Sequence, residues 1–187
     1  MRSEAQQSPA RDLAATAGAV ERLIALEPDA WQELFQQHHR RMYNFAYVRT
    51  GDPSLAEEIA SEVFAAAAQA IARYRPTGAP IAAWLYRIAR NITADHLERR
   101  RRHPQTSLDG VEIIATGWAP AIERSADLAQ VLRLLTREQQ EVIALRFFDD
   151  CSLAETAAAL GRSVGAVKVM QHRALAALKR HLGGSRL

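Results

Sequence analysis

Apolar residues recur every three or four positions along almost the whole chain, and no segment alternates with the period of two that is typical of a strand. The spacing predicts a helix from Asp29 to about Gly51, with Gln32 at the capping-box position. A second helix is expected after Asp52, because aspartate is a favoured N-cap and the proline that follows it is a favoured first residue. The sequence therefore predicts an all-α protein.

Proline and glycine divide this helical pattern. The segment RPTGAP, residues 75–80, ends the second helix, because two prolines and a glycine cannot continue it. A third helix then runs to Arg102, and the chain after it holds two prolines, two glycines and no apolar stripe. We expect two small helical domains, an N-terminal helical bundle and a C-terminal helix-turn-helix domain, joined by a flexible linker. The expected parts are an N-terminal extension (1–28), the N-terminal module (29–103), the linker (104–124) and the C-terminal module (125–187).

Capping residues organise the C-terminal module. Thr136 and Ser152 each stand three residues before a Gln or Glu, which is the capping-box pattern of a helix start. Gly161 then makes a turn, and Ser163 caps the last helix, which is longer and basic. A helix of about eight residues, a turn with glycine and a longer basic helix have the spacing of a helix-turn-helix.

The last helix is amphipathic. Its apolar face carries Val167, Ala174, Leu178 and Leu182. The opposite face carries Lys168, Val169, His172, Arg173 and Arg180. Basic side chains can bond guanine edges or phosphates, and valine can touch a thymine methyl group, so this face suits the DNA major groove. A solvated face of an ordinary bundle helix is the alternative.

The net charge of +3 conceals two basic segments. Residues 86–103 hold six arginines against two acids, and residues 162–187 hold six basic residues and no acid. Together these segments carry a charge of +10, which leaves −7 for the rest of the chain. Two separate basic surfaces indicate two contacts with a polyanion, and solvated helix faces are the plainer alternative.

Aromatic rings accompany the first basic segment. Tyr74, Trp84 and Tyr86 flank the loop at residues 75–80, and the third helix ends in four consecutive arginines. Rings that stack on bases and arginines that follow phosphates are typical of proteins that bind single-stranded nucleic acid. Core packing is the alternative for each ring, and we favour it for Trp84, which lies one turn before Ile88.

A third surface is acidic. Glu57, Glu58 and Glu62 lie on the polar side of the second helix near its N-terminus, where the helix dipole favours negative charge. The preference for acidic residues at a helix start is sufficient to explain them. A docking site for a basic partner is the more specific alternative.

Several classes of function are disfavoured. The sequence has no phosphate-binding glycine loop, no dinucleotide-binding glycine pattern and no zinc motif built from histidine or cysteine pairs, so we expect no enzyme, no cofactor and no metal site. It has no secretory signal and no run approaching the roughly 20 apolar residues of a membrane span. We expect no membrane insertion and a cytoplasmic location, which the single cysteine, Cys151, also fits.

Three segments, in order, carry a resemblance to a known family. They are LAEEIASEVF (55–64), IAAWLYRIARNITADHLERRRR (81–102) and the segment from Leu135 to Leu182. Together they resemble a bacterial RNA polymerase sigma factor of the extracytoplasmic-function (ECF) type of the sigma-70 family. The resemblance implies that the first segment binds core polymerase, that the second recognises and melts the promoter −10 element, and that the third binds the −35 element.

The resemblance also implies roles for individual residues. Core polymerase would be contacted by Glu57, Glu58, Ser61 and Glu62. A flipped −10 base would be captured by the loop that contains Arg75, Pro76, Thr77 and Gly78, together with Asn91. The DNA strands would be held by Arg87, Arg90, Arg99, Arg100, Arg101 and Arg102. The −35 element would be bound by Arg162, Ser163, Lys168, Val169, His172 and Arg173. The implied partners are core RNA polymerase, promoter DNA and an anti-sigma factor.

Two other functions stay open. A helix-turn-helix regulator whose N-terminal module senses a ligand or partner would have no need of the arginine run and the aromatic loop. A helical-bundle enzyme that uses Glu57, Glu58 and a histidine would lack paired metal-ligand spacing. We therefore expect a sigma factor that directs core polymerase to a subset of promoters and helps to open them.

Overall fold

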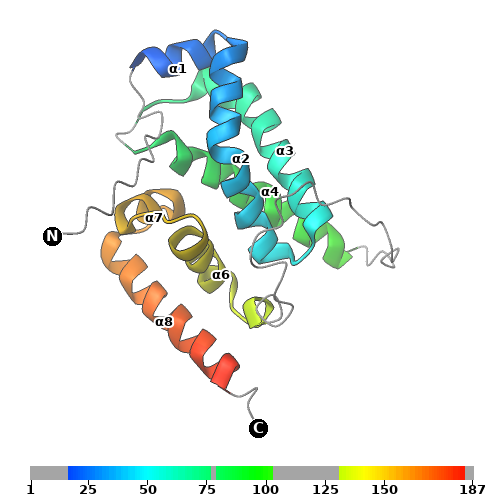
Figure 1. The fold of residues 1–187 in the computed structure, drawn as a ribbon, viewed down its shortest axis with the longest axis vertical. Helices are drawn as coiled ribbons and strands as arrows, with labels where there is room; N and C mark the ends of the chain where they lie inside the picture. The colour runs from blue at the N-terminus through cyan, green and yellow to red at the C-terminus, as the bar shows by residue number, and fades with distance from the viewer. Residues whose placement is uncertain (1–16, 77–78, 103–130, 184–187) are drawn as a thin grey trace, which may run out of the picture.

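The computed structural model describes residues 17–76, 79–102 and 131–183, and every regular element within these ranges is helical, as the apolar spacing predicts (Figure 1). The N-terminal elements are α1 (Ala17–Ile24), α2 (Pro28–Thr50), α3 (Pro53–Ala70), the short 3-10 helix η1 (Ile71–Arg73) and α4 (Ile81–Arg102). The C-terminal elements are α6 (Arg137–Ile143), the π-helical turn η2 (Ala144–Phe148), α7 (Leu153–Leu160) and α8 (Val164–Gly183). The predicted linker lies outside the described residues.

The helices that the structure describes include none that is both long enough and apolar enough to span a bilayer.

The central helix of the N-terminal module is α2, which packs against both α3 and α4. Its Leu34, Met42 and Phe45 are fully buried. Ile59 of α3 and Leu85 of α4 are fully buried as well. Because burying an aliphatic or aromatic side chain of this size contributes about 1.5–3 kcal/mol, the apolar stripes read from the sequence hold these three helices together.

The starts of α2 and α3 show one confirmed prediction and one wrong one. Asp52 caps α3, since its Oδ1 accepts a hydrogen bond from a backbone N–H of the first turn at 3.1 Å. The predicted capping box of Asp29 and Gln32 is wrong, because α2 begins at Pro28 after the N-cap Glu27, which makes no side-chain cap bond. Proline lacks an N–H and has a helical φ, so Pro28 starts the helix ahead of Asp29 without loss of a hydrogen bond.

Part of the predicted extension is folded onto the N-terminal module. In α1, Val20 and Leu23 are buried, and Nε1 of Trp31 donates a hydrogen bond to the carbonyl oxygen of Leu23 at 3.0 Å. α1 also contacts η1. The extension therefore braces the start of α2, a role that the sequence left open.

The C-terminal module has the predicted helix-turn-helix. Both capping boxes are present, at Thr136 and at Ser152. Gly161 follows α7 with a φ of 63°, a left-handed conformation that favours glycine. Ser163 then caps α8, because its Oγ accepts a hydrogen bond from the N–H of Ala166 at 3.2 Å. These local bonds set α8 against α6 and α7, the helices on which it packs.

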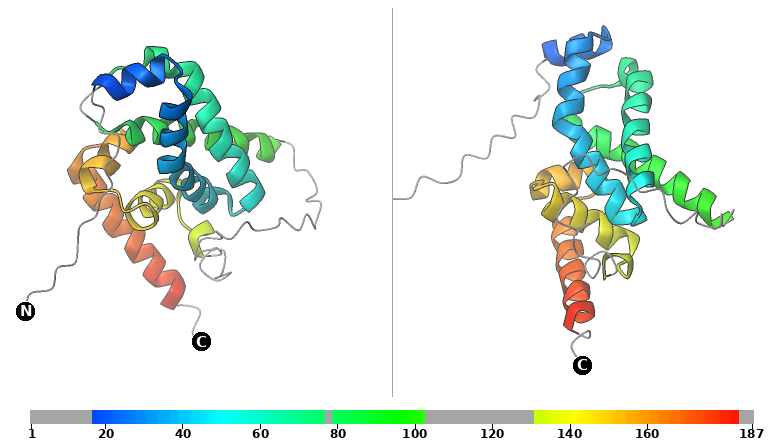
Figure 2. Two further views of the ribbon diagram at one scale, coloured as in Figure 1. Left: turned by 45° about the horizontal axis from the view of Figure 1, so that its top comes forward. Right: turned by 45° about the vertical axis from the view of Figure 1, so that its right-hand side comes forward.

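The two modules pack against each other, a feature that the pattern of two tethered domains does not predict. α4 lies against α7, and α2 lies against α6 and η2 (Figures 1 and 2). One hydrophobic core includes Phe45 and Leu85 from the N-terminal module and Leu145 and Leu160 from the C-terminal module. α8 extends away from this junction (Figure 2).

Candidate nucleic-acid interface

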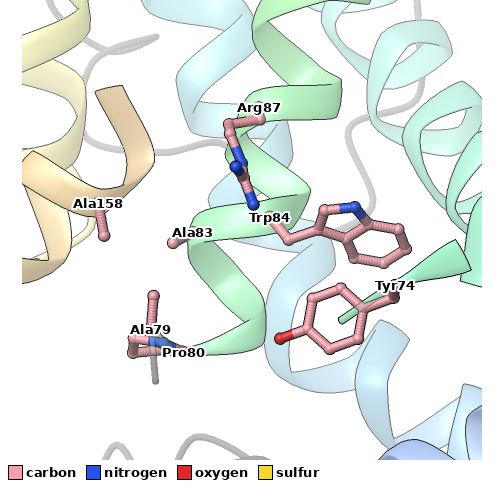
Figure 3. Close-up of a pocket in the computed structure, with 7 residues that line it drawn as sticks. All are labelled: Tyr74, Ala79, Pro80, Ala83, Trp84, Arg87 and Ala158. Atoms are coloured by element: carbon pink, nitrogen blue, oxygen red, sulfur yellow. The ribbon is translucent and has the colours of Figure 1, made fainter. Parts of the chain in front are cut away.

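A pocket of about 120 Å³, here called the ring pocket, lies at the start of α4 (Figure 3). The rings of Tyr74 and Trp84 form one side of it, with centroids 4.9 Å apart and planes inclined at 51°. Ala158 of α7 lines the side away from these rings. Trp84 is half-buried; it packs against the core, as expected, and it also lines the pocket. The structure therefore confirms the core packing that we favoured for this ring, and it also places the ring in the wall of the pocket.

A wider hollow of about 370 Å³ shares the rings of the pocket. It is also lined by Arg73, Arg75, Arg87, Ile88 and Asn91. Nη1 of Arg75 donates hydrogen bonds to the carbonyl oxygens of Ala72 at 3.2 Å and Tyr74 at 3.0 Å, which fixes the chain where it leaves η1. Rings and guanidinium groups around one open hollow suit a strand whose bases stack and whose phosphates pair with arginine.

The residues predicted to bind the −10 element do not all share this hollow. Arg75, Arg87 and Asn91 line it, and Pro76 is exposed next to Arg75 in the chain. Arg90 instead points to the C-terminal module, where its Nη1 donates a hydrogen bond to the carbonyl oxygen of Leu160 at 3.1 Å. Thr77 and Gly78 lie outside the described residues.

The arginine run at the end of α4 is exposed. Nη2 of Arg100 lies 2.8 Å from Oδ2 of Asp52, and Nε of Arg102 lies 3.0 Å from Oε1 of Glu98. Exposed ion pairs of this kind contribute only about 0–1 kcal/mol. These arginines can therefore exchange their carboxylate partners for phosphates at little cost.

The outer face of α8 has the predicted character. Every residue named for it is exposed: Lys168, Val169, His172, Arg173 and Arg180. Val167 and Ala174 are buried on the opposite face. Gln171, which is half-buried, accepts a hydrogen bond from Nε of Arg146 at 2.9 Å, so its amide oxygen is satisfied there. Arg162 and Ser163 are exposed at the start of the helix.

The acidic surface of α3 includes rings that sequence reasoning missed. Glu57, Glu58, Ser61 and Glu62 are exposed. Oε1 of Glu57 lies 3.2 Å from Nε2 of His39. Beside them the ring of Phe35 is 42% exposed, and its centroid lies 4.8 Å from that of Phe64. The exposed ring therefore gives this acidic surface one apolar group beside its carboxylates. At 100° per residue Phe35 falls on the same side of α2 as Trp31 and Met42, so the apolar spacing gave no signal that its ring would be exposed.

A buried polar cluster joins the two modules and also escaped sequence reasoning. Asp149 accepts hydrogen bonds from Nδ2 of Asn44 at 3.1 Å and from the hydroxyl of Tyr86 at 2.9 Å. Nη1 of Arg49 lies 3.1 Å from Oε1 of Glu141, and both side chains are buried. Buried polar groups need such partners, so these pairs fix how α2 and α4 meet the C-terminal module.

Burial sets the protonation of this cluster. It raises the pKa of Asp149 to about 7, against the lowering effect of the bonds from Asn44 and Tyr86. Burial also raises the pKa of Tyr86 well above its ordinary value, so the phenol keeps its proton and donates a hydrogen bond to Asp149. The pKa of Cys151 is raised by burial to about 12, so this cysteine is a thiol rather than a reactive thiolate.

No group of three or more histidine, cysteine or carboxylate side chains in the described ranges is arranged to hold a metal ion.

Two family descriptions match the chain: Sigma-70 region 2 over residues 34–103, and Sigma-70, region 4 over residues 125–178. Among curated relatives, the ECF RNA polymerase sigma factor BldN of Streptomyces coelicolor is 36% identical over 87% of this chain and 64% of its own length. The chain thus spans slightly less than two thirds of that relative. The ECF RNA polymerase sigma factor SigW of Bacillus subtilis is 31% identical over 83% of this chain and 90% of its own length.

A solved structure of the sigma factor RpoE in complex with the anti-sigma factor NepR, from Bartonella quintana, is also similar. It is 26% identical, covers 83% of this chain and 98% of the solved one, and superposes with a TM-score of 0.63. The likeness therefore extends through both modules.

Proposed function

Since the chain belongs to the ECF sigma factors of the sigma-70 family, we propose that it binds core RNA polymerase, recognises the −10 and −35 elements of a promoter and promotes DNA melting. Sigma factors are non-enzymatic subunits of RNA polymerase, so the chain acts by binding and not by catalysis. Its place of action is the cytoplasm, where promoter DNA and polymerase meet.

The observation that carries this proposal is that one chain has two nucleic-acid surfaces of different kinds. The hollow beside Tyr74 and Trp84 suits unpaired bases, whereas the α8 face suits a duplex groove. A promoter that is opened at −10 and stays paired at −35 offers both unpaired bases and a duplex groove. Because the two binding sites are linked, binding of one site to the promoter raises the effective concentration of the other site near its own DNA element.

We assign residues 29–103 to sigma region 2 and residues 125–187 to region 4. The ring pocket and the wider hollow then hold −10 bases, with Arg75, Pro76, Thr77, Gly78 and Asn91 around the flipped base. The phosphates are held by Arg87, Arg90, Arg99, Arg100, Arg101 and Arg102. The −35 contact is made by Arg162, Ser163, Lys168, Val169, His172 and Arg173. The exposed positions of most of these residues support the assignment.

The acidic and aromatic surface of α3 is assigned to core polymerase. Glu57, Glu58, Ser61 and Glu62 supply polar contacts, and Phe35 supplies an apolar anchor of the kind that dominates protein interfaces. An anti-sigma factor is a further proposed partner, supported by the similar RpoE structure, which contains one.

A run-off transcription assay with purified core polymerase and a pool of promoter fragments tests the function. The chain should co-purify with core and support initiation on a subset of promoters. A matched pair of variants sharpens the test: Phe35→Ser removes the exposed ring from the proposed core contact, whereas Phe147→Ser changes a similarly exposed ring on the C-terminal module. Absence of both core binding and initiation would rule the sigma-factor function out and leave the helix-turn-helix regulator.

Replacing Arg173 with alanine should weaken binding to −35 duplexes. If the guanidinium bonds a base, the cost is about 1–3 kcal/mol on the preferred sequence and less on others. Fluorescence anisotropy measures the loss of affinity for the preferred duplex and for other duplexes, all taken from a randomised pool. Arg22→Ala, which removes an equally charged and exposed residue of the N-terminal extension, is the control. An equal loss on every sequence would identify Arg173 as a phosphate contact and contradict base reading.

A further inference from the structure

The four polar residues of α3 that are assigned to core polymerase form a surface with two edges. At 100° per residue they follow one another around the helix in the order Glu57, Ser61, Glu58 and Glu62. Glu57 and Glu62 are therefore the outermost of the four. Because α2 and α4 both pack against α3, each edge carboxylate lies next to a neighbouring helix.

The Glu62 edge is fixed by a histidine of α4. Nε2 of His96 lies 2.7 Å from Oε2 of Glu62. Because an ionised carboxylate can only accept, Nε2 carries the proton and donates the hydrogen bond. The side chain of His96 is 10% exposed, whereas that of Glu62 is 45% exposed. A buried ring thus fixes one carboxylate oxygen, and the carboxylate itself stays accessible to a partner.

The Glu57 edge is contacted by a histidine of α2. Nε2 of His39 lies 3.2 Å from Oε1 of Glu57, an ion-pair contact without the alignment of a hydrogen bond. The same imidazole packs against two aromatic rings, with its centroid 4.4 Å from that of Phe35 and 6.1 Å from that of Phe64. His39 therefore joins the edge carboxylate to the exposed ring of Phe35, through a looser contact than the one at His96.

A glutamate on this surface gains from being fixed before a partner arrives. Exposed glutamates sample several rotamers, and fixing such a side chain on binding costs roughly a two- to tenfold loss of affinity. Glu58 and Glu62 are also four residues apart, a spacing at which like charges on a helix repel each other. The bond from His96 keeps the Glu62 carboxylate in one place despite this repulsion.

We propose that His39 and His96 are positioning residues of the core-binding surface. They fix the edge carboxylates of α3 in the orientation in which basic groups of core polymerase meet them. The inference rests on the proposed role of this surface in binding core polymerase. Each histidine acts through the glutamate that it contacts, and the aligned, more deeply buried contact of His96 has the larger effect.

Affinity for core polymerase, measured by fluorescence anisotropy with the whole chain labelled at its N-terminus, tests the role of His96. His96→Leu removes the donor and should weaken binding roughly two- to tenfold, the cost of fixing Glu62 during binding. His96→Gln keeps an N–H donor and should recover most of the affinity. The melting temperature and the affinity for −35 duplex show whether each variant is folded, since α8 shares no residue with this surface.

A double-mutant cycle separates positioning from a general effect on the fold. Glu62→Ala removes the carboxylate that His96 fixes, so adding His96→Leu to it should cause no further loss of affinity for core polymerase. The crossed pair, Glu62→Ala with His39→Leu, is the matched control. Its two losses should multiply, because these residues lie at opposite edges and share no contact in the described structure.

The outcomes distinguish this inference from the proposed function. If the wild type binds core polymerase and folded His96→Leu and His39→Leu bind it equally well, the positioning role is overturned and the sigma-factor function stands. If His96→Leu causes the same loss with and without Glu62, the histidine does not act through that carboxylate, which also overturns the inference. If His96→Leu does not fold, the same cycle with His39 and Glu57 decides. A wild-type chain that does not bind core polymerase overturns both.

Discussion

Replacing Phe45 with alanine should lower the free energy of unfolding by about 3–5 kcal/mol, the usual cost of truncating a fully buried phenylalanine. Phe45 is 0% exposed in the C-terminal half of α2, and its ring centroid lies 5.7 Å from that of Tyr86. Truncation leaves a cavity that α3 and α4 cannot fill without moving. Urea denaturation followed by circular dichroism measures the change.

A matched control is available in the C-terminal module. Phe147 is 47% exposed, so Phe147→Ala removes the same ring from a site where little packing is lost. It should change the free energy of unfolding by less than about 1 kcal/mol, as surface substitutions generally do. Comparable losses in the two variants would contradict the burial of Phe45 on which the description of the core depends.

Replacing Trp84 with alanine should reduce the yield of open promoter complexes by roughly ten- to hundredfold, since stacking on an aromatic ring contributes about 1–3 kcal/mol per base. The ring lies against Tyr74 and lines both the ring pocket and the wider hollow. Permanganate footprinting of unpaired thymines in complexes with core polymerase measures the yield directly.

The controls for Trp84 separate stacking from folding. Trp84→Phe keeps an aromatic face and should recover most of the open complexes. Affinity for core polymerase and for −35 duplex should match the wild type in both variants, because neither proposed surface includes this ring. An alanine variant that opens promoters as well as the wild type would exclude Trp84 from the −10 site.

Much of the candidate site follows from local sequence signals. The exposed face of α8 and the turn at Gly161 were predicted from helical spacing, capping residues and glycine. These signals succeed because they involve residues within about four positions of one another, where backbone geometry alone decides which side chains meet. Where two local signals compete, as Pro28 and Asp29 do at the start of α2, the predicted N-cap, Asp29, lies two residues after the observed one, Glu27.

The junction between the modules depended instead on contacts across long stretches of chain. Tyr86 and Asp149 are 63 positions apart, and Asn44 and Asp149 are 105 apart, so no spacing rule links them. The same packing gives Arg90 a partner that no spacing rule predicts, the carbonyl oxygen of Leu160. A basic residue on an outward helical face is free for DNA only if no other module covers that face.

The sequence by itself determined the long helices, most of their starts and which side of each is apolar, because caps, prolines and a period of three to four residues act within single turns. Only the tertiary structure decided which basic and aromatic residues share a hollow and where polar groups are buried. It also decided that Arg90 donates a hydrogen bond to Leu160 of α7. Those outcomes depend on how two amphipathic modules bury their remaining apolar surface against each other, and that fit is a property of whole surfaces and not of local spacing.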